Sequence, residues 1–123
     1  MTVASLRHHT VSFKHALEGL IYTFKSQPNF RVHSVFAILA ISSGLFFSIT
    51  PSEWSVIVFV IGLVLICEMI NTSIESVVDL LTDQYHLSAK IAKDVSAGMV
   101  LVSALIAVTT GLLVFAPHIW RYF

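Results

Sequence analysis

Three long apolar runs constrain this chain more than any other feature of its sequence. No Asp, Glu, Lys or Arg lies between Arg31 and Glu53, the next run extends from Trp54 to Cys67, and residues 95–115 contain no ionisable side chain. At about 1.5 Å per residue, roughly 20 helical residues cross the 30 Å hydrocarbon core of a bilayer. Residues 95–115 are too long and too uniformly apolar for a buried helix of a soluble bundle. We therefore expect an integral membrane protein.

The composition agrees with this expectation and excludes several other classes of protein. Charged residues make up 11% of the chain, whereas about 25% is typical of soluble domains. Seven basic and seven acidic residues cancel, so no net charge attracts the protein to nucleic acid. The single cysteine, Cys67, excludes a disulfide framework and the usual zinc-binding patterns.

The expected fold is all-α and integral to the membrane, with residues 1–123 forming one domain. An amphipathic interfacial helix is predicted over about 11–26, because apolar residues recur there at steps of three and four: Phe13, Leu17, Leu20, Ile21 and Phe24. Gln27-Pro28-Asn29 breaks this helix. Transmembrane helices are predicted over about 32–49, 54–79 (including a cytoplasmic extension) and 95–115.

The distribution of basic residues predicts the orientation of these spans. Six of the seven lie in the N-terminal segment and in the predicted loop 76–94, namely Arg7, Lys14, Lys25, Arg31, Lys90 and Lys93, and only Arg121 lies at the other end. Cytoplasmic segments carry an excess of Lys and Arg. We therefore expect the N-terminus and the loop 76–94 in the cytoplasm and the C-terminus outside.

A polar face follows the second apolar run. At about 100° per residue, one side of a helix carries Glu68, Asn71, Thr72, Glu75 and Asp79. A lone Glu68 at this depth is either functional or a snorkelling residue at the membrane edge. Three carboxylates on one face, however, repel each other unless a cation neutralises them. The pattern favours a metal- or phosphate-handling site, and its oxygen ligands favour Mg²⁺.

Two lysines lie on the side of the membrane where these carboxylates emerge. Lys90 and Lys93 could offset phosphate charge, but they equally serve as the orientation signal. No glycine-rich phosphate loop is present. His33, His86 and His118 are each interpreted as isolated interfacial or loop residues, and Ser96-Ala97-Gly98 as a segment for close helix packing. The residues alone leave open a kinase, a lipid-phosphate phosphatase and a non-catalytic ion-binding bundle.

The polar face also carries a resemblance to a known family. The motif Glu68-x-x-Asn71-Thr72-x-Ile74-Glu75-x-x-Val78-Asp79, followed by Ala92-Lys93-Asp94 and Ala97-Gly98, resembles the signature of the prokaryotic diacylglycerol kinases. Asn29-Phe30-Arg31-Val32-His33 and Glu53-Trp54 are similar to the undecaprenol kinase branch of Gram-positive bacteria. The similarity extends from about Ser12 to Pro117.

The resemblance implies a lipid kinase of the bacterial cell (inner) membrane. Such an enzyme transfers the γ-phosphoryl group of ATP, with Mg²⁺, to the hydroxyl of a membrane lipid. Undecaprenol is the first-ranked acceptor and diacylglycerol the alternative. The resemblance further implies a homotrimer with active sites between subunits.

Individual roles also follow from the resemblance. Glu68 matches the general base and Glu75 a metal ligand, whereas the residues expected to shape the nucleotide and phosphate site are Asn71, Asp79, Lys93 and Asp94, with Tyr85 and His86 in the same loop. Gln27 stands near the position where the family usually has a second metal-binding glutamate. Its amide keeps an oxygen ligand but lacks the negative charge. The residues that bind the lipid are not assigned.

Overall fold

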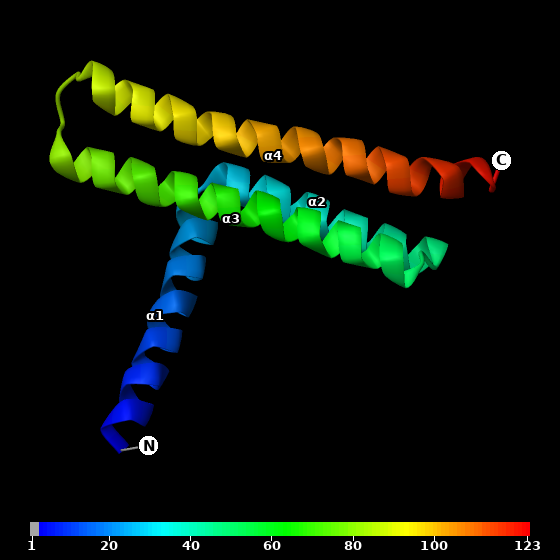
Figure 1. The fold of residues 1–123 in the computed structure, drawn as a ribbon, viewed down its shortest axis with the longest axis horizontal. Coiled ribbons are helices and arrows are strands. Elements are labelled where there is room, and N and C mark those ends of the chain that lie inside the picture. The colour runs from blue at the N-terminus through cyan, green and yellow to red at the C-terminus, as the bar shows by residue number, and fades with distance from the viewer. Residues whose placement is uncertain (1–2) are drawn as a thin grey trace.

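The computed structural model describes the backbone of residues 3–123 and the side chains of residues 12–123. This part of the chain consists of four helices: α1 (Val3–Ser26), α2 (Pro28–Phe47), α3 (Pro51–Leu81) and α4 (Leu87–Trp120). Helices α2, α3 and α4 form a bundle, and α1 leaves it at a steep angle (Figure 1). The three bundle helices are each long and apolar enough to cross a membrane. The expected all-α membrane architecture is thereby confirmed.

The three bundle helices differ in length, and this difference creates a projecting end. Helix α2 has 20 residues, whereas α3 has 31 and α4 has 34. At about 1.5 Å per residue, α2 matches the hydrocarbon core and the other two exceed it by roughly 15–20 Å. The surplus extends past the junction of α1 and α2 (Figure 1). The segment 76–94, predicted as a loop, is therefore helical except for residues 82–86.

The junction of α1 and α2 is a sharp bend with a defined set of contacts. Gln27 alone separates the two helices, and Pro28 occupies the first position of α2, where its missing N–H costs no hydrogen bond. The Arg31 guanidinium donates to the carbonyl oxygens of Phe24 and Lys25 at 3.3 and 2.8 Å. It thereby satisfies free carbonyls at the end of α1. The predicted break at Gln27-Pro28-Asn29 is confirmed.

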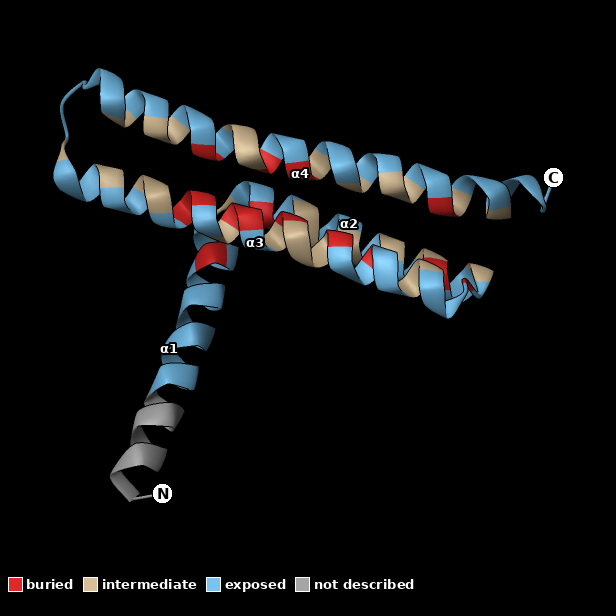
Figure 2. Cartoon of the chain, in the orientation of Figure 1, coloured by how far each residue is buried: buried red, intermediate tan, exposed pale blue. Residues whose placement is uncertain are grey.

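Helix α1 makes few contacts beyond this junction. The predicted apolar stripe is exposed along its length, from Phe13 (79% exposed) to Phe24. Figure 2 shows the same contrast, with buried residues concentrated where the bundle helices face each other. An exposed apolar stripe on a helix that leaves the bundle is typical of a helix lying in the membrane interface.

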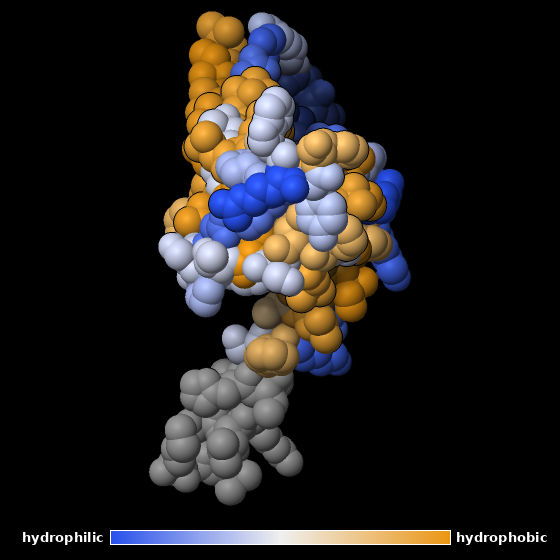
Figure 3. Space-filling view, turned by 90° about the vertical axis from the view of Figure 1, so that its right-hand side faces the viewer, coloured by the Kyte–Doolittle hydropathy of each residue, from blue (hydrophilic) through white to orange (hydrophobic). Residues whose placement is uncertain are grey.

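The opposite end of the bundle holds the turn between α2 and α3. Ser48 ends α2 in the left-handed conformation with φ 51°, and Thr50 and Glu53 form a capping box that starts α3. Glu53 also lies 3.0 Å from His118 of α4. The prediction that His118 is an isolated residue is therefore wrong. Figure 3 views the molecule from this end and shows hydrophobic side chains over much of the surface, with hydrophilic ones in patches.

Gly44 allows α2 and α3 to approach each other closely, which yields a stability prediction. A Cβ atom at Gly44 would lie 2.8 Å from Cη2 of Trp54 and 3.1 Å from Cδ1 of Ile49, whereas one at Gly62 would meet no atom within 4 Å. Overpacking of this kind costs roughly 1–3 kcal/mol. We expect Gly44→Ala to unfold at a lower temperature in detergent than Gly62→Ala, which gains the same helix propensity. Equal unfolding temperatures would contradict this packing.

Candidate functional site

The predicted polar face of α3 forms as expected, and its membrane end is buried. Glu68 is 2% exposed, and Asn71 and Thr72 are also buried. Farther along the helix Glu75 is half-buried and Asp79 is exposed. The opposite side, represented by Ile70, Ser73 and Val77, is exposed. The polar face therefore starts inside the bundle at Glu68 and ends in its projecting part at Asp79.

Asn71 connects this face to α4. Its side-chain nitrogen donates to Oε1 of Glu75 at 3.3 Å, and its side-chain oxygen accepts a hydrogen bond from the Ser96 hydroxyl at 2.7 Å. Asn71 and Ser96 are both buried, so the bond between them is shielded from water. Together the two bonds hold the amide in one orientation. Asn71 thereby positions the Glu75 carboxylate, which stays accessible.

The Thr72 hydroxyl does not contribute to the site. It donates to the Glu68 backbone carbonyl at 2.9 Å. Thr72 thus lies on the polar face as the helical spacing predicts, but its hydroxyl hydrogen is already used within the helix.

Charged residues continue the site where α3 and α4 project from the bundle. Lys93 Nζ lies 2.5 Å from Oδ1 of Asp79, an ion pair between the two helices. Lys90, one turn before Lys93 on α4, pairs with Asp94 of the same helix. All four side chains are partly or largely exposed, so these pairs add little stability by themselves. Their consequence is an accessible cluster of two cations and two carboxylates beside Glu75.

An imidazole from another helix lies next to the Glu68 carboxylate. Nε2 of His33, in α2, lies 3.4 Å from Oε1 of Glu68. Oε1 has no hydrogen-bond partner among the described residues. Every other buried side-chain oxygen or nitrogen atom of these residues has one. A buried carboxylate oxygen without a partner is unfavourable in the chain alone. The atom is therefore available to a ligand that donates a hydrogen bond.

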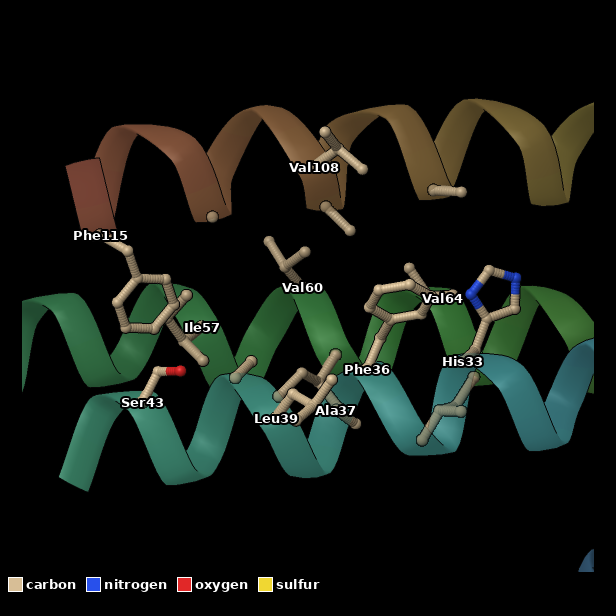
Figure 4. Close-up of a pocket in the computed structure, with 16 residues that line it drawn as sticks. His33, Phe36, Ala37, Leu39, Ser43, Ile57, Val60, Val64, Val108 and Phe115 are labelled. Atoms are coloured by element: carbon tan, nitrogen blue, oxygen red, sulfur yellow. The ribbon is translucent and has the colours of Figure 1, made fainter. Parts of the chain in front are cut away.

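An apolar groove begins at His33, the residue that contacts Glu68. It has a volume of about 380 Å³ and lies between α2, α3 and α4. Figure 4 shows His33 at one end of it and Phe115 at the other, with Val60, Val64 and Val108 between them. Its lining is almost entirely hydrocarbon, and His33 is its one ionisable residue. The groove is suited to an apolar chain rather than to a nucleotide.

Three of the predicted site residues lie apart from this cluster. Tyr85 and His86 are exposed in the 82–86 connection, and neither takes part in the contacts described above. Gln27 is half-buried between α1 and α2, and its backbone N–H donates to the Thr23 carbonyl at 2.9 Å. Within the described residues, no group of three or more His, Cys, Asp or Glu side chains is arranged to hold a metal ion.

Two residues of the site were missed by sequence reasoning. His33 was interpreted as an isolated interfacial residue and Ser96 as a packing residue, yet His33 contacts Glu68 and Ser96 anchors Asn71. Both contacts join residues on different helices, so the periodicity of one helix gives no signal for them. The only available signal was that each is a polar residue next to an apolar run, at the depth of the polar face.

Comparison with known proteins identifies the family. The prokaryotic diacylglycerol kinase family matches residues 14–115. The undecaprenol kinase of Bacillus subtilis is 40% identical over 108 residues, which cover 88% of this chain and 88% of the relative. The diacylglycerol kinase of Synechocystis sp. is 42% identical over 82% of this chain and 58% of its own length. The diacylglycerol kinase of Escherichia coli K12 is 25% identical over 92% of this chain and 98% of its own.

The matched region contains the site residues of α2, α3 and α4, from His33 through the polar face of α3 to Ser96. The family match and the 40% identical relative agree with the resemblance carried by the Glu68–Asp79 motif. The chain belongs to the prokaryotic diacylglycerol kinase family, a family of lipid kinases.

Proposed function

We propose that the protein transfers the γ-phosphoryl group of ATP to the terminal hydroxyl of undecaprenol. The observation that carries this proposal is the position of Glu68. Its unpartnered carboxylate oxygen lies 3.4 Å from His33, which forms one end of an apolar groove. Farther along the same helix face, Glu75 and Asp79 lead to the accessible charged cluster. A base in this position can meet a lipid hydroxyl from the hydrocarbon and a phosphate from water.

In the proposed reaction Glu68 accepts the proton of the acceptor hydroxyl. The lipid oxygen forms a bond with the γ-phosphorus, the bond from that phosphorus to the bridging oxygen breaks, and ADP leaves. Phosphoryl transfer depends mainly on positioning and on charge stabilisation. The cluster around Glu68 therefore contains the chemistry that such a reaction needs, although its residues come from only three helices.

Mg²⁺ fits the oxygen donors of this site. The ion is usually held by one or two carboxylates together with substrate phosphates, so it requires no cluster of three acidic side chains. Glu75, oriented by Asn71 and still accessible, is the proposed ligand, and the resemblance adds the amide oxygen of Gln27. When bound with ATP, Mg²⁺ would neutralise charge on the β- and γ-phosphates.

The nucleotide is proposed to bind along the projecting part of α3 and α4. Lys93 would exchange its contact with Asp79 for a phosphate oxygen, since both are anionic acceptors for its ammonium group. Asn71, Asp79 and Asp94 complete the proposed phosphate site. Tyr85 and His86 are proposed to contact the nucleotide from the 82–86 connection, where they are exposed.

The acceptor is proposed to lie with its hydrocarbon chain in the groove that starts at His33. The groove is apolar and leads away from Glu68 into the bundle, so a chain within it would place a terminal hydroxyl next to the carboxylate. Undecaprenol is favoured by the relative from Bacillus subtilis, which is named an undecaprenol kinase and matches 88% of its own length. Diacylglycerol is the second candidate, because several relatives are named diacylglycerol kinases.

The assembly and its orientation are also proposals. We propose a homotrimer in which neighbouring subunits complete each site; the subunit number is what the resemblance implies, and the half-buried Glu75 leaves room for a neighbouring subunit. The excess of basic residues at the α1–α2 junction and on the projecting helices supports a cytoplasmic N-terminus and 82–86 connection in the bacterial inner membrane. ATP would then reach the charged cluster from the cytoplasm.

Replacement of the proposed base tests the function directly. Glu68→Gln keeps the size of the side chain but cannot accept the proton, so turnover should fall by about a hundredfold or more. The measurement is phosphate transfer from Mg-ATP in mixed micelles, with undecaprenol and diacylglycerol compared at equal surface concentration. We expect faster turnover of undecaprenol.

Faster turnover of diacylglycerol would leave the assignment of the site residues unchanged and would replace undecaprenol as the proposed acceptor. Full activity of Glu68→Gln would refute the role of Glu68, and release of phosphate from a lipid phosphate without ATP would instead indicate a phosphatase.

The two lysines of α4 provide a matched pair for the phosphate site. Lys93→Met removes the cation that faces Asp79, and we expect kcat/KM for Mg-ATP to fall by about tenfold or more. Lys90→Met removes the same charge one turn earlier on α4 and should have a much smaller effect. Steady-state kinetics at varied Mg-ATP measure both. Equal losses in the two variants would mean that only the overall charge of this end matters.

Gln27 allows the proposed metal site to be tested by a gain of function. Gln27→Glu adds a carboxylate, a stronger ligand for Mg²⁺ than an amide oxygen. The Mg²⁺ concentration for half-maximal activity should therefore fall several-fold, and Glu75→Gln should raise it. Titration of activity with Mg²⁺ at constant ATP measures both changes. An unchanged Mg²⁺ dependence in Gln27→Glu would place Gln27 outside the metal site.

A further inference from the structure

We propose that His33 is a positioning residue of this lipid kinase, and that its imidazole holds the Glu68 carboxylate toward the acceptor hydroxyl. The inference rests on the proposed function, in which Glu68 accepts that hydroxyl's proton. It begins from the distance of 3.4 Å between Nε2 of His33 and Oε1 of Glu68. These two groups come from different helices, α2 and α3, and both lie where the bundle is buried.

The other polar groups near Glu68 are already engaged. On α3, the Thr72 hydroxyl donates to the Glu68 backbone carbonyl, and the Asn71 amide donates to Glu75. On α4, the Ser96 hydroxyl donates to Asn71. Among the described side chains His33 is therefore the polar group left to orient the carboxylate. A catalytic base is generally oriented by a third group next to it, and the imidazole at 3.4 Å is in a position to do this for Glu68.

The spacing of the pair also leaves room for substrate. At 3.4 Å the imidazole is within ion-pair distance, yet Oε1 has no hydrogen bond. His33 is 22% exposed and forms the polar end of the apolar groove. A hydroxyl arriving along the groove would meet Oε1 with the imidazole beside it. His33 keeps its own proton in this arrangement, and the acceptor's proton passes to Glu68.

A purely structural role for His33 makes a different prediction. If the imidazole only joined α2 to α3, its removal would lower stability and would impair the enzyme whether or not Glu68 is present. If His33 acts through Glu68, its removal matters only when the carboxylate is there. A double-mutant cycle separates these two cases.

The experiment measures turnover of the preferred acceptor in mixed micelles for His33→Ala, His33→Gln, Glu68→Gln and the combinations with Glu68→Gln. We expect His33→Ala to lower kcat by about tenfold or more, with KM for Mg-ATP unchanged. His33→Gln should recover much of the loss, because its amide N–H can donate to the carboxylate. In the Glu68→Gln background, His33→Ala should cause no further loss.

His118→Gln is the matched control, because His118 contacts Glu53 at 3.0 Å at the opposite end of the bundle. It should keep wild-type kcat. If His33→Ala does not fold, as judged by its thermal unfolding in detergent, His33→Leu replaces it and keeps apolar contact with the groove.

Two results would overturn the proposal: full activity of His33→Ala, or equal losses from His33→Ala with and without the Glu68 carboxylate. Failure of the proposed function is distinguishable, because wild type would then be inactive on every acceptor or Glu68→Gln would be fully active.

Discussion

The structure depends on a mismatch between the lengths of its helices and the thickness of a membrane. Helix α2 is just long enough to cross, whereas α3 and α4 continue together for more than ten further residues. Two paired helices can carry charged side chains into water while their apolar halves stay in lipid. The polar face of α3 begins at Glu68 and runs outward along this projection. The length difference thus brings a buried carboxylate and an exposed ion pair onto one continuous surface.

Burial then determines what each polar residue of that surface can do. Asn71 and Ser96 satisfy each other inside the bundle, and the Thr72 hydroxyl bonds to its own helix. These hydrogen bonds keep the side chains in fixed orientations, because breaking a hydrogen bond in a low dielectric costs much free energy. Glu68 differs, since one of its oxygens remains without a partner among the described residues. Among the described residues the network leaves this one oxygen unpaired, 3.4 Å from His33, and the proposed acceptor hydroxyl would donate to it.

Sequence reasoning predicted the features that depend on one helix and missed those that depend on two. The spacing of Glu68, Asn71, Glu75 and Asp79 was sufficient to place them on one face, because helical geometry alone fixes that relation. Hydropathy ended the third span near residue 95, although α4 starts at Leu87, because Lys90 and Asp94 lower the apolar signal without breaking the helix. The contact of His33 with Glu68 joins residues 35 positions apart, and only the packing of α2 against α3 creates it.

The reaction of a lipid with a nucleotide requires a site open to both hydrocarbon and water. The apolar groove leads from His33 into the bundle, and the charged residues lead from Glu75 to Lys93 in the opposite direction. Neither region could bind both substrates, since one lacks charge and the other lacks apolar walls. Glu68 lies between the two regions on α3, which lines the groove with Val60 and Val64 and carries Glu75 into the charged region. In the proposed reaction the membrane boundary itself therefore separates and aligns the two substrates.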